Sequence, residues 1–179
     1  MSASSPLVKP AATFPVSVVM ECVTRQANRW SARTWRAVAV VAGDSLSSTP
    51  VPGSPIHSDT ESEQYLWRGF SLELYKDATE SYWRNLMSPH PVLCVICQPD
   101  DDGQPVPVTV TADYDQASAG MEADDTVYAV PMPPGMYGWL GVFVVEYSQP
   151  TPRKARKGKQ GLQEEPHASP PPRVRHPRS

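Results

Sequence analysis

The sequence predicts an α+β fold, with a mostly antiparallel five- to six-stranded sheet or a partly closed barrel, two or three helices, and disordered termini. Three observations predict this class. Apolar side chains alternate at period two in several short segments, their spacing becomes helical near residues 78–87, and Pro- and Gly-rich stretches separate these units. The 179 residues suit one domain of ordinary size with extensions.

The segment 14–42 is the most fold-specifying part of the chain because it holds two apolar runs. Residues 14–23 alternate apolar with polar side chains, which predicts a half-buried strand. Residues 35–42 are apolar on both faces, which predicts a strand in the middle of a sheet. The polar connection between them, residues 25–34, retains Trp30, and we expect this indole to face solvent.

Residues 43–63 contain three prolines and two glycines among many serines, which predicts a long flexible surface loop. A strand over 65–75 follows. Its alternation should place four apolar side chains on one face, namely Leu66, Phe70, Leu72 and Leu74. The capping-box pattern Asp77–Glu80 then predicts a helix over about 78–87, which Pro89 and Pro91 end.

Shorter elements follow this helix. The segment 92–98 is apolar on both faces and predicts another central strand, and the prolines in 105–111 favour an edge strand. The remaining elements are expected as a turn at 99–103, a short helical turn within 113–120 and a strand at 126–130.

The last element, residues 134–147, fits either a helix or a strand. Met136, Leu140 and Phe143 recur at helical spacing after a Pro-Pro pair that suits a first turn. Three glycines oppose a helix, since each costs about 1 kcal/mol relative to alanine in a helix interior. The β-branched valines that follow oppose it as well. The spacing favours the helix.

Charge is distributed unevenly along the chain. Residues 1–150 carry 8 Lys or Arg against 17 Asp or Glu, whereas residues 151–179 carry 8 against 2. We expect a single domain over 14–148, with a disordered lead at 1–13 and a disordered basic tail at 149–179. The acidic body argues against a specific nucleic-acid partner. Residues 1–12 contain no apolar run long enough for a signal peptide or a membrane span, and the odd cysteine count indicates reduced thiols, so we expect a cytoplasmic protein.

No combination of residues in the sequence identifies a reaction. Cys94 and Cys97 lie three residues apart in a predicted strand, so they should face opposite sides about 10 Å apart and serve packing. Metal or redox use, together with Cys22 or His90, is the alternative interpretation. The triplet Asp100–Asp102 lacks the spaced ligands of a calcium loop. His57 and His90 have no nucleophile or carboxylate at suggestive spacing. We therefore expect no catalytic residues, no metal and no cofactor.

Tryptophan and arginine gather around the first two strands. Both residue types are enriched at the centres of protein interfaces, which predicts a partner-contact site formed by Trp30, Arg33, Trp35 and Arg36. Packing of the indoles in the core is the alternative interpretation.

Several motifs point together to one family, namely the segments 14–21, 35–43 with Trp30, 72–74, 80–86, 91–95, 130–133, and Trp139 with Phe143-Val144. With these motifs the chain resembles an uncharacterised bacterial domain family whose genes often lie beside those of molybdenum-dependent formate dehydrogenase. The resemblance covers residues 14–148 and implies a helix for the final segment.

Two functions follow from these observations. The first is a non-catalytic accessory protein that binds a partner, with a formate dehydrogenase subunit as the partner that the resemblance implies, during assembly or cofactor loading. The alternative is a small enzyme or cofactor-handling protein in molybdenum-cofactor (molybdopterin guanine dinucleotide) metabolism. Against the alternative, the sequence lacks the glycine-rich loop with a nearby cation that a nucleotidyltransferase of this type needs.

Overall fold

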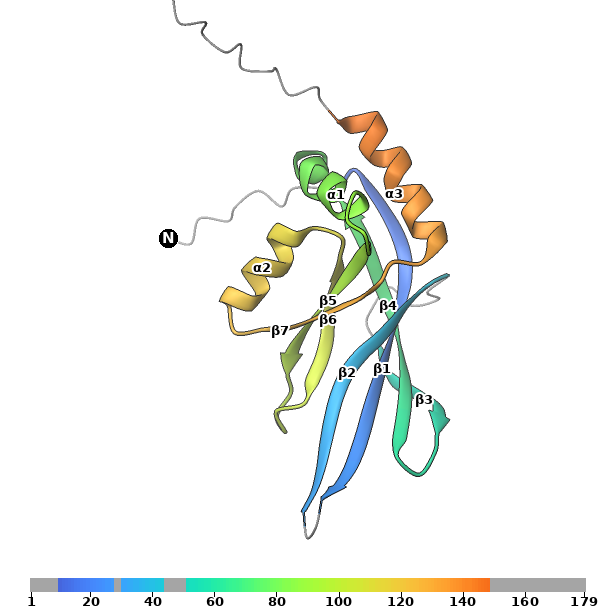
Figure 1. Cartoon of the computed structure of the whole chain (residues 1–179), viewed down its shortest axis with the longest axis vertical. Coiled ribbons are helices and arrows are strands. Elements are labelled where there is room, and N and C mark those ends of the chain that lie inside the picture. Colours follow the sequence, from blue (N-terminus) through green and yellow to red (C-terminus); the bar gives the residue numbers. More distant parts are fainter. Residues whose placement is uncertain (1–9, 28–29, 44–50, 149–179) are drawn as a thin grey trace, which may run out of the picture. The chain divides into compact units, whose positions relative to one another are not determined.

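A computed structural model describes residues 10–27, 30–43 and 51–148, which form an α+β fold with two antiparallel sheets (Figure 1). The strands of the first sheet are β1 (Ala12–Ala27), β2 (Trp30–Ala42), β3 (Val51–Ser58) and β4 (Ser62–Leu74). Those of the second are β5 (Val92–Pro99), β6 (Pro105–Thr111) and β7 (Thr126–Pro131). The helices are the 3₁₀ turn η1 (Lys76–Ala78), α1 (Thr79–Leu86), α2 (Tyr114–Glu122) and α3 (Pro134–Tyr147).

The α+β class is thereby confirmed, but the predicted single sheet of five to six strands is wrong. The strand orders are β2-β1-β4-β3 and β6-β5-β7, and within the described residues these sheets do not close into a barrel. The disordered lead predicted at 1–13 is wrong for residues 12–13, which belong to β1 and pair with β4. Residues 1–9 and the predicted tail 149–179 lie outside the described residues.

The positions of β1 and β2 in the sheet are the reverse of those predicted, since β1 is central and β2 lies at the edge. β1 lies between β2 and β4, and it is buried on both faces, with Val18 on one and Val19 on the other. β2 lies at the edge of the sheet among the described strands, and Val41 near its end is 48% exposed. The prediction failed because Glu21 in β1 is buried by bonds to both neighbouring strands, which a single-strand pattern does not show.

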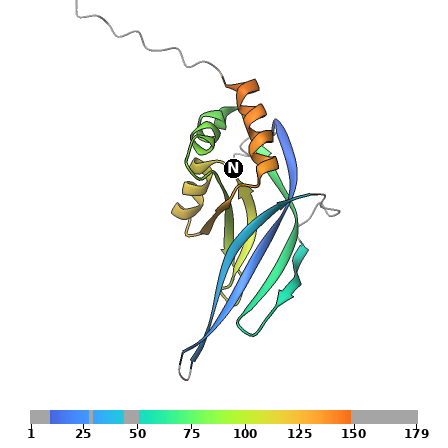
Figure 2. The same cartoon turned by 45° about the vertical axis from the view of Figure 1, so that its right-hand side comes forward.

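The predicted polar connection between these strands is itself strand. β1 and β2 pair from Val16↔Ala42 to Ala27↔Trp30, so only residues 28–29 lie between the two paired segments. Figures 1 and 2 show this hairpin extending past the second sheet. The side chain of Trp30 lies outside the described residues, so its exposure stays a prediction.

Part of the predicted loop at 43–63 forms β3, which pairs antiparallel with β4. Residues 44–50 lie outside the described residues. β3 occupies the edge of its sheet and its register shifts twice, at Val51/Ser54 and at Pro55/His57. An edge position tolerates proline because one row of amides needs no partner strand, so the Pro-rich composition was compatible with a strand after all.

The predicted alternation of side chains along β4 is wrong at one end because the strand contains a bulge. Pairing with β1 advances from Val16↔Phe70 to Val18↔Trp67, so β4 contains one extra residue. Gly69 adopts a φ of +91° there, a conformation that glycine reaches without steric cost. Consequently Trp67 and Tyr65, rather than Leu66, share the face of Phe70, Leu72 and Leu74.

The second sheet follows the sequence closely. β5 is its central strand, and β6 is an edge strand, as predicted. Val95 and Cys97 belong to the core, while Ile96 contacts the position where Gly120 of α2 would carry a Cβ. The turn before β6 also forms as predicted: Gly103 has a φ of +75°, and Asp100 Oδ1 accepts from the backbone amides of Asp102 and Gln104.

The helices at 79–86 and 134–147 confirm both helix predictions. The capping box is wrong, because residues 76–78 form a 3₁₀ turn and α1 begins after Ala78 without a side-chain cap. Side chains of α1 and α3 join those of both sheets in one core, and Asn85 of α1, fully buried, binds the backbone at the start of β5 and just after β6.

Candidate functional site

A groove of about 610 Å³ lies between the edge strand β2 and the second sheet. Arg33, Thr34 and Trp35 form its wall on β2. The opposite wall comes from the β5–β6 turn, the residues before β7, and β7 itself; its members are Pro99, Asp102, Gly103, Gln104, Pro105, Asp124, Thr126 and Tyr128. Two of the four predicted contact residues, Arg33 and Trp35, therefore lie together in a concave site.

Arg33 is held in place by residues of three strands. Its Nε donates to the sulfur of Cys22 at 3.2 Å, and its Nη2 pairs with Glu63 Oε2 at 3.2 Å. The guanidinium lies 5.7 Å from the ring centroid of Trp35, a cation–π distance. About half of the Arg33 side chain remains exposed (49%), so a partner could contact the guanidinium without first breaking these bonds.

Trp35 connects the two walls of the groove. Its ring lies 5.5 Å from that of Tyr65, and its backbone carbonyl accepts a hydrogen bond from the Tyr128 hydroxyl at 3.0 Å. This bond ties β2 to β7 at the groove. The indole Nε1 is buried and has no hydrogen-bond partner among the described residues. The aromatic ring is therefore fixed, partly buried, and packed against the core.

Arg36 lies on the opposite face of β2, away from the groove. Its Nε and Nη2 donate to Glu21 Oε2 at 2.7 and 2.6 Å, and Gln64 donates to Glu21 Oε1 at 3.2 Å. The Gln64 and Arg36 bonds hold the pKa of the Glu21 carboxyl below its usual value. Arg36 thus binds Glu21, and its side chain is 61% exposed on that face, so its contact with a partner stays a prediction. Trp30 is placed only as the first residue of β2.

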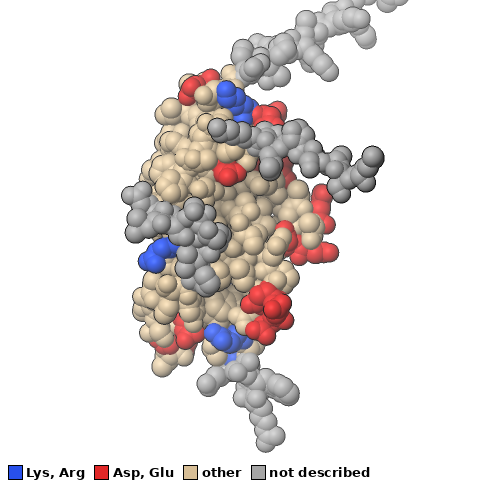
Figure 3. All heavy atoms as spheres, turned by 180° about the vertical axis from the view of Figure 1, so that it is seen from behind, with Lys and Arg blue, Asp and Glu red and all other residues tan. Residues whose placement is uncertain are grey.

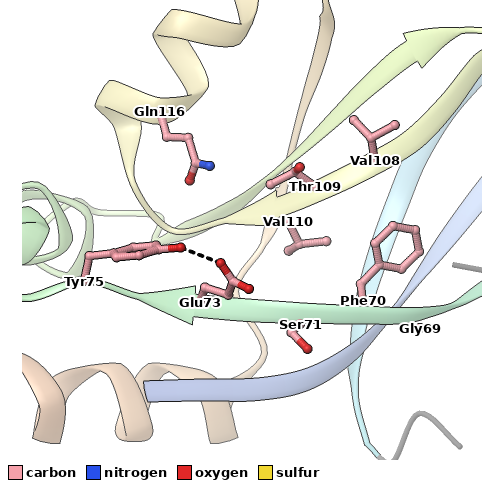
Figure 4. Close-up of a pocket in the computed structure, with 9 residues that line it drawn as sticks. All are labelled: Gly69, Phe70, Ser71, Glu73, Tyr75, Val108, Thr109, Val110 and Gln116. Atoms are coloured by element: carbon pink, nitrogen blue, oxygen red, sulfur yellow. Dashed lines mark hydrogen bonds between the residues drawn. The ribbon is translucent and has the colours of Figure 1, made fainter. Parts of the chain in front are cut away.

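A second, smaller pocket of about 250 Å³ lies between β4 and β6 (Figure 4). The Tyr75 hydroxyl donates to Glu73 Oε2 at 2.5 Å, and the Gln116 side chain points toward the same space. The hydrogen bond to Glu73, together with burial, raises the pKa of Tyr75 to about 12. The phenol therefore stays protonated near neutral pH and remains a hydrogen-bond donor to Glu73.

The cysteines and histidines show no catalytic arrangement in the described segments. Cys94 and Cys97 are buried free thiols, and burial raises the pKa of both, that of Cys97 to about 12. Such thiols are protonated and unreactive, which fits the predicted packing role. His57 belongs to the exposed strand β3, and its Nε2 lies 3.5 Å from Oδ2 of Asp59, which follows the strand. Among the described side chains, no group of three potential ligands could hold a metal ion.

Acidic side chains surround the groove on the side of the second sheet. Asp102 and Asp124 line it, and three neighbours in the same turns add further carboxylates, namely Asp100, Asp101 and Asp125. Seen from behind, the larger groups of acidic side chains lie toward the right-hand side of the molecule, and smaller ones lie elsewhere on this face (Figure 3).

The longest described helix, α3, has 14 residues, and none of the described helices has the length and apolar character that a membrane crossing requires.

Sequence reasoning missed the second wall of the groove. Tyr128 and Asp124 lie more than 80 residues from Arg33, so no local pattern connects them. The sequence does allow one part of the site to be predicted. The alternation of side chains along a strand places residues 33 and 35 on one face and residue 36 on the other, so Arg36 is expected to lie apart from Arg33 and Trp35. This division follows once residues 30–36 are recognised as part of β2.

Comparison with known proteins identifies the family of the chain. No curated protein and no solved structure matches it. A family model described as "Protein of unknown function (DUF3305)" matches residues 15–157, most of the chain and nearly all of its described part. The match agrees with the resemblance to an uncharacterised domain family, and the chain belongs to this family of proteins of unknown function.

Proposed function

We propose that this protein is a non-catalytic accessory protein that binds an extended segment of a partner protein in the groove beside β2. The observation that carries the proposal is the pairing of a fixed Trp35 and a half-exposed Arg33 in a concave site next to a sheet edge. Aromatic and arginine side chains in such sites supply much of the binding energy of protein interfaces.

The edge of β2 favours an extended partner segment. β2 pairs with β1 on one side, and no described strand forms a ladder with its other side. An added strand can therefore hydrogen-bond to this edge, as in other cases of strand addition, while its side chains enter the groove. The Tyr128–Trp35 hydrogen bond limits where the added strand can lie, because it already occupies the Trp35 carbonyl.

Charge defines the partner segment further. Asp102 and Asp124 line the groove, and its one arginine already pairs with Glu63. A segment with basic side chains complements this lining, whereas the pyrophosphate of a molybdopterin dinucleotide would meet carboxylates. The groove thus supports partner binding over the cofactor-handling alternative. A formate dehydrogenase subunit is the partner that the sequence resemblance suggests.

Co-purification with the dehydrogenase tests the proposal with two matched variants of the full chain. Asp102→Asn/Asp124→Asn removes two charges from the groove, and asparagine suits the positive φ of 65° at residue 124. Asp77→Asn/Glu80→Gln removes two exposed charges near α1 instead. We expect the groove variant to lose at least tenfold in capture and the control to match the wild type.

Two results would overturn parts of the proposal separately. Equal capture by both variants would remove the groove from the interface. Absence of capture by the wild-type chain, with or without bound pterin on the dehydrogenase, would remove the dehydrogenase as partner.

A further inference from the structure

The outward face of α3 is apolar although it contacts none of the described elements. One face of this helix enters the core through Met136, Leu140, Phe143 and Val144. On the other face, Val142 is 68% exposed and Val145 is 78% exposed. Glu146 is the only charged residue in the helix. A helix that is apolar on all sides is normally covered on all sides, so this face is expected to meet another surface.

The glycines of α3 support the same conclusion independently. A Cβ added at Gly138 or Gly141 would meet nothing within 4 Å, so the fold of the chain itself does not require glycine there. Each glycine nevertheless lowers helix stability by about 1 kcal/mol relative to alanine. Glycine at such positions allows another backbone or a bulky side chain to approach closely.

We propose that the outward face of α3 pairs with the same face of a second copy of this chain, in an antiparallel, two-fold arrangement. At 100° per residue, Gly138, Gly141, Val142 and Val145 form one stripe. In an antiparallel pair centred between residues 141 and 142, Val145 lies opposite Gly138 of the second copy, and Val142 lies opposite Gly141. The stripe is therefore self-complementary, as a two-fold interface requires.

Charge selects the second copy and the antiparallel direction. Glu146 lies in the last turn of α3, where the negative end of its own helix dipole disfavours a carboxylate. Antiparallel pairing brings Glu146 beside the first turn of the other α3, whose positive end stabilises it. A parallel pair would instead place two Glu146 carboxylates together. Because α3 carries one carboxylate and no basic residue, a strongly acidic partner would be repelled, and the uncharged Gly and Val stripe itself suits an apolar surface.

The proposed interface is small, and it therefore predicts a weak dimer that forms as concentration rises. Interfaces at the low end of the usual size range give transient complexes, and a pair of four-turn helices belongs there. Sedimentation velocity of the full chain, from a few micromolar to several hundred micromolar, should show a rising dimer fraction.

Three variants locate the contact. Val145→Glu should abolish the dimer, whereas Met121→Glu, which makes the same change at a 56% exposed position of α2, should leave it intact. Gly138→Ala should raise the melting temperature of the chain by improving helix propensity, yet shift dimerisation to at least tenfold higher concentration, because Val145 of the second copy loses its space. These opposite effects separate a contact role from a folding role.

A chain that stays monomeric over the whole range would overturn the proposal, and so would a dimer that persists unchanged in Val145→Glu or Gly138→Ala. A monomeric chain whose Val145→Glu variant no longer captures the dehydrogenase would assign α3 to a different partner. That result would also overturn self-association. The groove variants leave α3 unchanged, so failure of this test and failure of the proposed function remain distinguishable.

Discussion

Replacing Asn85 by alanine tests how α1 is joined to the second sheet. This side chain is fully buried, and its Nδ2 donates to the carbonyls of Val92 and Ala112 at 2.8 and 2.9 Å. Its Oδ1 accepts from the Val92 amide at 3.0 Å and from the Tyr114 hydroxyl at 3.1 Å. One amide thus satisfies polar groups on β5, at the end of β6, and in α2.

The expected loss follows from the groups left without a partner. Each buried polar group that loses its only hydrogen bond costs about 1–3 kcal/mol. The Ala112 carbonyl is the most buried of the four partners, while Val92 and Tyr114 are half-buried and can recover part of the loss through water. We therefore expect Asn85→Ala to lower the free energy of unfolding by about 3–5 kcal/mol, a large part of the 5–15 kcal/mol typical of a domain.

Urea unfolding followed by circular dichroism measures this loss, with Gln116→Ala as the control for removing an exposed amide. Asn85→Asp adds a second check. Its carboxylate would face two carbonyl oxygens, so the folded state would raise its pKa, and the variant should regain stability as pH falls from 7 toward 4. A loss below about 1 kcal/mol for Asn85→Ala would refute the proposed role of this side chain, since that is the value of one ordinary hydrogen bond.

Two further predictions concern the first sheet. The folded state lowers the pKa of Glu21, so its contribution is present above the unfolded pKa of about 4.3 and is lost as pH falls through the lower folded value. Urea midpoints between pH 7 and 3 should therefore fall more steeply for the wild type than for Glu21→Gln, and parallel profiles would contradict this reasoning. A Cβ at Gly53 would lie 2.6 Å from Trp67 Nε1 and 2.8 Å from Tyr65 Cβ, so Gly53→Ala should destabilise the chain by about 1–3 kcal/mol and speed amide exchange in β3. An unchanged midpoint and exchange pattern would show that β3 does not pack on Trp67.

The sequence predicted those features that depend on local composition. α3 formed despite its glycines because Met136, Leu140 and Phe143 recur at helical spacing and their face is buried. β6 lies at a sheet edge because proline cannot donate to a ladder on both sides. The turn at 99–103 followed from the conformations that aspartate and glycine favour.

Features that depend on pairing between distant strands were not predictable in this way. The bulge at Gly69 reverses the faces of Leu66 and Trp67, and a single-strand pattern does not show whether a glycine is inserted or in register. β3 escaped detection because edge pairing with β4 orders a Pro-rich segment. The surroundings of Trp35 in the groove depend on such distant pairings. The bulge in β4 brings Tyr65 beside Trp35, and the second sheet brings the Tyr128 hydroxyl to the Trp35 carbonyl.

Amide hydrogen exchange with and without the captured partner tests the proposed groove most directly. Amides on the open edge of β2 exchange rapidly when that edge is free, and an added strand would protect them. We expect slower exchange within residues 32–36 and 126–128 on binding, with little change in β3. Binding that leaves residues 32–36 unprotected would contradict the proposal that β2 receives the partner.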